Sequence, residues 1–115
     1  MKRLALLLAI AALSFAADIT GTWSFEVETE MGSGSPTFTF KQDGEKLTGT
    51  YRGQLGEAPV TGKVTGDKVE FSFEASPAGE KIKVVYSGAI GGGNAMQGSI
   101  DFGGQMKGTF KAKKQ

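Results

Sequence analysis

The 115-residue chain contains no cysteine and no histidine. The lack of cysteine excludes disulfides and thiolate nucleophiles, and the lack of histidine excludes an imidazole base. The usual zinc and copper ligands are missing together. We therefore expect stability to come from packing and backbone hydrogen bonds, and we predict no metal site and no cofactor.

The acids and serines that remain offer little for catalysis. Ser33 and Ser35 stand in a Gly/Ser-rich stretch with no base to activate them. No spacing of acidic residues resembles a calcium loop, and no helix follows the glycine-rich stretches to make a phosphate site. We expect no catalytic residues and a protein that is not an enzyme.

The net charge is also small, with 13 Lys+Arg against 12 Asp+Glu. Removal of the N-terminal segment described next takes away Lys2 and Arg3, which leaves 11 basic residues against 12 acidic ones. No basic field is left to attract nucleic acid or an anionic membrane. The sequence predicts no nucleic-acid partner.

The N-terminus has the form of an export signal. Lys2 and Arg3 precede an apolar run from Leu4 to Leu13, and Ser14-Phe15-Ala16 supplies small residues at the positions a signal peptidase reads. The run is too short to cross about 30 Å of hydrocarbon. We predict a signal peptide over residues 1–16 with cleavage before Ala17, one domain over 17–115, secretion or release to the periplasm, and no stable membrane insertion after cleavage.

Beyond residue 18, apolar and polar residues alternate, and no helical period is longer than a turn. Short turns such as Asp43-Gly44 and Gly66-Asp67 separate the alternating stretches. We predict an all-β chain that forms an eight-stranded antiparallel up-and-down β-barrel. The expected strands are 18–28, 36–42, 46–54, 58–65, 68–75, 80–90, 94–102 and 106–113. The outward positions are mostly polar, which favours a monomer.

A five-residue unit, apolar–x–Gly–x–apolar, recurs six times. Its copies are ITGTW (19–23), LTGTY (47–51), VTGKV (60–64), YSGAI (86–90), MQGSI (96–100) and MKGTF (106–110). Alternation places each glycine inward, where a glycine costs about 0.5–1 kcal/mol of strand stability. Two interpretations stay open: the glycines let coiled strands bend around a narrow barrel, or they leave a cavity at its waist.

The two ends of the predicted barrel differ. One end has short glycine-rich turns, and the other has the longer connections together with all three prolines. Because longer loops usually surround the mouth of a barrel with an interior site, we place the candidate binding end there. The candidate lid loop consists of Met31, Gly32, Ser33, Gly34 and Ser35. The alternative is a flexible hairpin loop without a role in binding.

These motifs resemble a known family. ITGTW, followed by the Asp-Gly hairpin and LTGTY, is similar to the opening of the avidin and streptavidin barrels, and YSGAI is similar to their Trp-Ser-Gly strand. The resemblance implies an eight-stranded calycin-type barrel, also called avidin- or lipocalin-like, with a binding site at one end. The chain also resembles small exported barrel proteins of environmental bacteria.

The family's biotin-binding residues carry over at one position. Tyr51 stands where the resemblance implies a biotin-contacting tyrosine. Phe25 replaces an expected asparagine, Ile82 and Val84 replace hydroxyl side chains, and the single tryptophan, Trp23, matches a structural one. Each unpaired polar group of the ligand would cost about 1–3 kcal/mol, so tight biotin binding is not expected.

The leading hypothesis is a non-enzymatic barrel that binds a small apolar molecule inside or at its loop-rich end. The proposed binding wall comprises Phe25, Val27, Phe38, Phe40, Tyr51, Phe73, Val84 and Tyr86, with the two tyrosine hydroxyls as orienting groups. The first alternative is a solid-core protein that acts through its surface on a protein partner, as an inhibitor, envelope component or accessory of a secreted enzyme. A degenerate biotin binder is the second.

Overall fold

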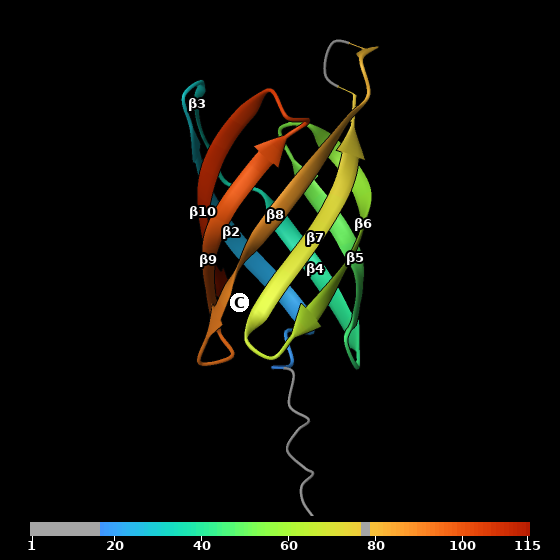
Figure 1. Cartoon of the computed structure of the whole chain (residues 1–115), viewed down its shortest axis with the longest axis vertical. Coiled ribbons are helices and arrows are strands. Elements are labelled where there is room, and N and C mark those ends of the chain that lie inside the picture. The colour runs from blue at the N-terminus through green and yellow to red at the C-terminus, as the bar shows by residue number, and fades with distance from the viewer. Residues whose placement is uncertain (1–16, 77–78) are drawn as a thin grey trace, which may run out of the picture.

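The computed structural model describes residues 17–76 and 79–115 as one closed antiparallel β-barrel (Figure 1). From β4 to β10 each strand pairs with the next one along the chain, and β2 pairs with both β3 and β4. β10 pairs in addition with β2, which closes the barrel. The strands are β2 (Gly21–Thr29), β3 (Gly32–Gly34), β4 (Thr37–Asp43), β5 (Lys46–Gly53), β6 (Gly56–Thr65), β7 (Lys68–Ala75), β8 (Ile82–Gly91), β9 (Ala95–Phe102) and β10 (Met106–Lys114). In the described part of the chain, no helix is long and apolar enough to span a membrane.

The nine strands form an eight-stranded barrel, because β3 and β4 are two parts of one barrel strand. Gly34 lies opposite Val27 and Thr37 lies opposite Ser24, so the register against β2 is the same for both parts. The prediction of an eight-stranded antiparallel barrel is therefore confirmed. The predicted signal peptide, residues 1–16, lies outside the described residues.

The alternating apolar and polar residues of the sequence face the inside and the outside of the barrel, respectively. In β7, Val69, Phe71 and Phe73 are buried, while Glu70 and Glu74 between and beyond them are exposed. The other long strands follow the same period of two, because successive side chains of a strand point to opposite faces. The interior is one continuous apolar core, and its largest fully buried side chains are Trp23, Phe25, Phe38, Phe40, Phe71 and Phe110.

The repeated glycines mark places where neighbouring strands approach closely. A Cβ at Gly49 would overlap the carbonyl oxygen of Thr39 on β4, and a Cβ at Gly62 would overlap that of Glu70 on β7. Such contacts let strongly coiled strands bend around a narrow barrel. At these glycines the structure supports the bending interpretation, because backbone of the neighbouring strand occupies the space a side chain would take.

The bottom of the barrel in Figure 1, the end at which β2 begins, is closed by residues 17–20. We expected strand from residue 18, but β2 begins only at Gly21, and the preceding residues fold across the end. The Ile19 carbonyl accepts a hydrogen bond from the Trp23 indole Nε1 at 2.9 Å, and its amide donates to the Gln42 Oε1 at 2.8 Å. Ile19 and Trp23 are both fully buried, so this end is plugged.

Candidate functional site

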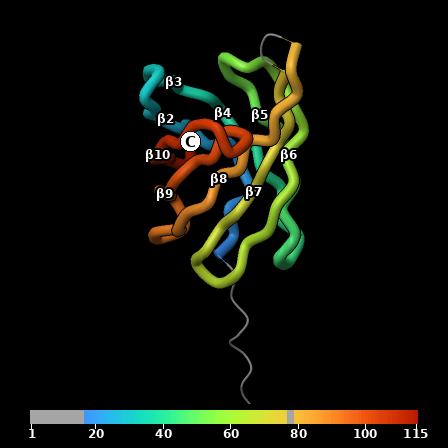
Figure 2. The backbone as a smooth tube through the Cα atoms, turned by 45° about the horizontal axis from the view of Figure 1, so that its top comes forward, coloured from blue at the N-terminus to red at the C-terminus, as the bar shows by residue number. Residues whose placement is uncertain are grey.

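The opposite end of the barrel is open. Figure 2 turns this end toward the viewer and shows the β2–β3 hairpin and the upper ends of β7 and β8 on opposite sides of it. An open cavity of about 1070 Å³ lies there. Its lining comprises Val27, Thr29, Met31, Gly32, Ser33, Gly34, Ser35, Pro36, Tyr51, Gly53, Gln54, Leu55, Phe73, Ile82, Tyr86, Phe102, Gln105 and Met106.

The structure divides the eight residues of the predicted binding wall into two groups. Val27, Tyr51, Phe73 and Tyr86 line the cavity. The remaining four, Phe25, Phe38, Phe40 and Val84, are buried residues of the packed core that do not line it. All eight point inward as alternation predicts, but only the first four come together at the open end.

Several residues of the cavity were missing from the sequence-based set. Leu55, Ile82 and Phe102 are partly buried hydrophobic residues packed against the core. Phe102 and Ile82 follow the inward alternation of their strands, and each stands beside a connection at the predicted mouth. Alternation combined with distance from the turn would have identified both. Leu55 lies within a two-residue turn, where no such pattern exists.

The predicted lid loop, residues 31–35, is not a loop along most of its length. Gly32–Gly34 forms β3 and is paired with β2, which leaves a two-residue turn at Glu30 and Met31. The Thr29 hydroxyl accepts a hydrogen bond from the Met31 amide at 3.0 Å and donates to the Gly32 carbonyl at 3.1 Å. The prediction of a loop was wrong here because pairing with β2 overrides the weak strand propensity of Gly-Ser-Gly.

The tip of this hairpin nevertheless forms one side of the cavity. All five residues of the predicted lid line it, and Met31 is 83% exposed. Met31 is the one large hydrophobic side chain exposed in the described part of the chain. Its thioether therefore offers a polarisable apolar contact at the rim.

Tyr51 is one of two buried phenols in the cavity. Its hydroxyl accepts a hydrogen bond from the Leu55 amide at 3.2 Å, which fixes the ring below the β5–β6 turn. Burial raises the pKa of Tyr51 above its ordinary value, and the Leu55 hydrogen bond opposes that shift in part. The phenol is therefore protonated at neutral pH, and its O–H remains a donor.

Tyr86 is the second phenol and lies deeper, with 2% of its surface exposed. Its ring stacks on Phe71 with 5.0 Å between centroids and contacts Phe110 at 5.1 Å. Burial raises the pKa of Tyr86 far above its ordinary value, and the nearby Tyr51 adds to the shift. Within residues 17–76 and 79–115, no protein group forms a hydrogen bond with its hydroxyl.

Because the Tyr86 hydroxyl lacks a protein partner among the described residues, Tyr86→Phe is expected not to lower the free energy of unfolding of the ligand-free protein and to raise it by up to about 1–3 kcal/mol, the cost of an unpaired buried hydroxyl. Tyr51→Phe removes the acceptor of the Leu55 amide and is expected to cost about 1 kcal/mol. Urea denaturation of both variants measures the difference. A loss above about 1 kcal/mol in Tyr86→Phe would mean that the hydroxyl is already satisfied within the protein.

The lining of the cavity carries no charge. Among the described residues it contains no Asp, Glu, Lys or Arg, and its polar groups are the two phenols together with Ser, Thr and Gln side chains. No group of three or more His, Cys, Asp or Glu side chains in these residues could hold a metal ion. The arrangement suits a neutral molecule, because burial of a charge without a partner is costly.

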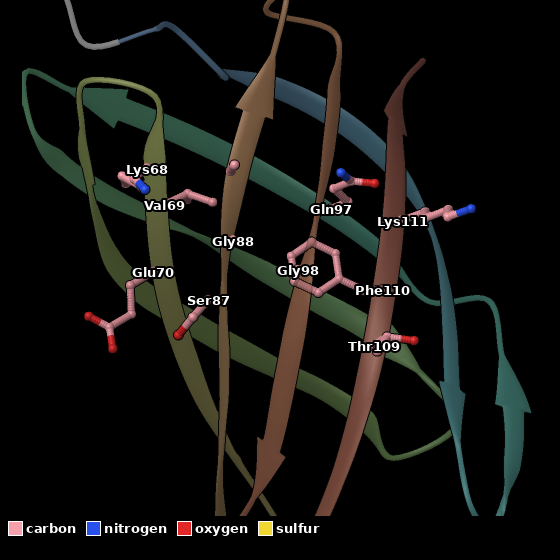
Figure 3. Close-up of a pocket in the computed structure, with 11 residues that line it drawn as sticks. Lys68, Val69, Glu70, Ser87, Gly88, Gln97, Gly98, Thr109, Phe110 and Lys111 are labelled. Atoms are coloured by element: carbon pink, nitrogen blue, oxygen red, sulfur yellow. The ribbon is translucent and has the colours of Figure 1, made fainter.

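A second hollow, of about 890 Å³, lies on the outside of the barrel across β7 to β10 (Figure 3). Gly88 and Gly98 face each other there on β8 and β9, and the Phe110 ring lies over Gly98. The side chains around it include Lys68, Glu70 and Lys111, all exposed to solvent. It is an open, mixed-charge groove without the enclosed apolar wall of the top cavity.

No family model matches this chain, and neither does any curated protein. Two solved structures share its fold. One is a redesigned β-barrel, b11L5F_LGL, with a TM-score of 0.69 and 18% identity over 84% of this chain and 91% of that one. The other is a redesigned β-barrel, mFAP1, bound to DFHBI, with a TM-score of 0.61 and 15% identity over 84% of this chain and 94% of that one. At these identities the similarity establishes the fold alone: a small, closed, eight-stranded antiparallel barrel.

Proposed function

We propose that this protein is a non-enzymatic binding barrel that holds a small, neutral, largely apolar molecule in the cavity at its open end. The observation that carries the proposal is the contrast between the two ends of the barrel. The bottom is plugged by Ile19 and Trp23, while the top opens into an uncharged cavity with two buried phenols. Concave, mostly apolar sites with a few fixed polar groups are the usual form of small-molecule sites.

The apolar area of the cavity supplies the affinity. Phe73 and Tyr51 form a stacked pair with 4.1 Å between ring centroids, and Phe102, Leu55 and Ile82 are further hydrophobic side chains in the lining. Removal of apolar ligand surface from water against such side chains contributes about 25 cal/mol per Å². The packed core underneath limits how deep a ligand enters, so the site is a bowl and not a tunnel.

One of the structurally similar barrels supports the proposal. The redesigned barrel mFAP1, a protein of the same fold, is bound to the small molecule DFHBI. A barrel of this size therefore accommodates a small molecule. Which residues of this chain make contact is argued from its own cavity.

We also propose that the protein is exported and that it is related to the avidin-like barrels. Lys2, Arg3 and the apolar run that follows support a cleaved signal and a secreted or periplasmic protein. The eight-stranded fold and the repeated Gly-Thr motifs support an evolutionary relationship to the avidin-like, calycin-type barrels. A biotin site is not proposed, because Ile82 in the cavity wall and Val84 below it lack the hydroxyls that such a ligand needs.

A pair of fluorescent dyes on one scaffold tests the proposal. N-phenyl-1-naphthylamine is neutral, and 1-anilinonaphthalene-8-sulfonate carries a negative charge on nearly the same skeleton. We expect the neutral dye to bind with a dissociation constant on the order of 10 µM and the sulfonate at least about ten-fold more weakly. The increase in dye fluorescence on titration with the purified protein measures both constants.

Ile82→Trp fills the mouth and is expected to abolish binding of the neutral dye. The matched control is Lys83→Trp, which adds the same ring to the next residue of β8 on the outer face. Equal loss in the two variants, or no binding by the unmodified protein, would contradict the proposal. In that case the solid-core alternative, a protein that acts through its outer surface, would be favoured.

A further inference from the structure

Tyr86 is the polar group that the fold leaves unexplained. Tyr86 is deeply buried and lines the cavity, and its hydroxyl has no hydrogen-bond partner among the described residues. Buried hydroxyls in native proteins almost always have a partner, since an unpaired one costs about 1–3 kcal/mol. A group left in this state at the wall of a cavity points to a partner that comes from outside the protein.

The packing around Tyr86 prevents its hydroxyl from turning to another partner. Phe71 stacks on one side of the ring with an interplanar angle of 19°, and Phe110 and Phe38 contact it at 5.1 and 5.2 Å between centroids. A ring surrounded in this way keeps its orientation, so the hydroxyl has a fixed position at the base of the site. A ligand atom that reaches this position is recognised without the entropic cost of ordering the side chain.

The chemistry of that ligand atom follows from the charges around it. Burial holds the pKa of both phenols above the ordinary value, so the Tyr86 hydroxyl keeps its proton and can donate it to an acceptor atom of the ligand. A carboxylate would be an acceptor, but no cation lines the cavity in the described residues to balance it. A neutral carbonyl oxygen meets both conditions.

The kind of side chain in the cavity wall indicates what carries the carbonyl. Tyr51 and Phe73 are stacked on each other, with 13° between their ring planes, and both rings line the cavity. Met31 and Met106 add polarisable sulfur atoms to the lining. Flat conjugated ligands gain more in such a cavity than branched aliphatic ones, because aromatic–aromatic and sulfur–aromatic contacts add to apolar burial.

We infer that the ligand is a flat, neutral, conjugated carbonyl compound that enters carbonyl end first and accepts a hydrogen bond from Tyr86. This inference rests on the proposed function, because it assigns a ligand class to the same cavity. Tyr51, whose hydroxyl already accepts from Leu55, contributes the aromatic wall and a second donor nearer the rim. Tyr86 is thus the residue that determines specificity.

Two isosteric probes test the inference. 2-Acetylnaphthalene carries a carbonyl group where 2-isopropenylnaphthalene carries a methylene group, and the two molecules have the same shape. Competition against N-phenyl-1-naphthylamine gives the affinity of each probe. We expect Tyr86→Phe to reduce the ratio of the ketone affinity to the alkene affinity by about ten-fold, because only the ketone accepts from the lost hydroxyl.

Ser87→Ala is the control variant, since it removes a hydroxyl from the neighbouring residue on the outer face of β8 and is expected to leave the ratio unchanged. The infrared carbonyl band of the bound ketone gives an independent readout. It is expected at a lower frequency in the unmodified protein than in Tyr86→Phe, because a hydrogen bond weakens the C=O bond.

The outcomes separate the inference from the proposed function. If neither naphthalene binds, the cavity is not a site for small apolar molecules and both ideas fail. If both probes bind and Tyr86→Phe leaves their ratio and the carbonyl band unchanged, the cavity remains a site and the assignment of a carbonyl ligand is overturned. If the ratio of ketone affinity to alkene affinity decreases in Tyr86→Phe but not in Ser87→Ala, the inference is supported.

Discussion

Gly49→Ala is expected to lower the free energy of unfolding by about 3 kcal/mol or more, out of a total of about 5–15 kcal/mol for a domain of this kind. The added Cβ would overlap the Thr39 carbonyl oxygen and press on the Phe40 backbone. Both are main-chain atoms of β4, so β4 and β5 must separate to relieve the overlap. A loss of this size lowers the melting temperature of a 100-residue domain by about 12–24 °C.

Gly91→Ala is the matched control for this prediction. Gly91 is also a strand glycine, at the end of β8, but a Cβ there would meet nothing within 4 Å. The same substitution is therefore expected to change stability by no more than about 0.5 kcal/mol. Thermal denaturation of the two variants side by side makes the comparison. Equal effects would mean that close approach of the strands is not the reason for glycine at position 49.

Phe25→Ala is the second substitution with a large expected effect, a loss of about 3–5 kcal/mol. Phe25 is 1% exposed and lies at the centre of the aromatic core. Its ring contacts Phe38 with 4.5 Å between centroids and stacks on Phe110 at 5.3 Å, and it meets Phe71 and Tyr86 edge to face. Removal of the ring leaves a cavity and also forfeits these aromatic pairs.

Chemical denaturation measures the effect, and Glu26→Ala provides the control. Glu26 is the next residue of β2 and faces water, so its replacement is expected to stay within about 0.5 kcal/mol. A small effect of Phe25→Ala would mean that the middle of the barrel is loosely packed. The proposed binding mode requires a solid middle, because it confines the ligand to the open end.

Alternation in the sequence was enough to predict the strands and the side on which each residue lies. The turns at Gly44 and Gly66 were also predictable, and both residues have the positive φ, 64° and 62°, that such turns require. These features are local, because they depend on the period of two and on the residue type at the turn. Local information therefore suffices for the architecture.

The height inside the barrel was not predictable in the same way for residues away from the strand ends. Phe25 and Tyr86 have the same inward pattern, yet one lies in the solid core and the other borders the cavity. Height depends on the stagger between strands and on how the aromatic rings fill the interior, and neither is encoded in the pattern of a single strand. The paired hairpin tip at 32–34 and the plug at 17–20 were missed for a similar reason, since both are fixed by distant partners.

The central claim is that the open end of the barrel, and not its outer wall, receives the ligand. An NMR titration of the ¹⁵N-labelled protein with N-phenyl-1-naphthylamine tests it directly. We predict amide shift changes concentrated at Leu55, Phe73 and Phe102 around the top cavity. Changes concentrated at Gly88 and Gly98 in the outer groove, or no changes at all, would contradict it.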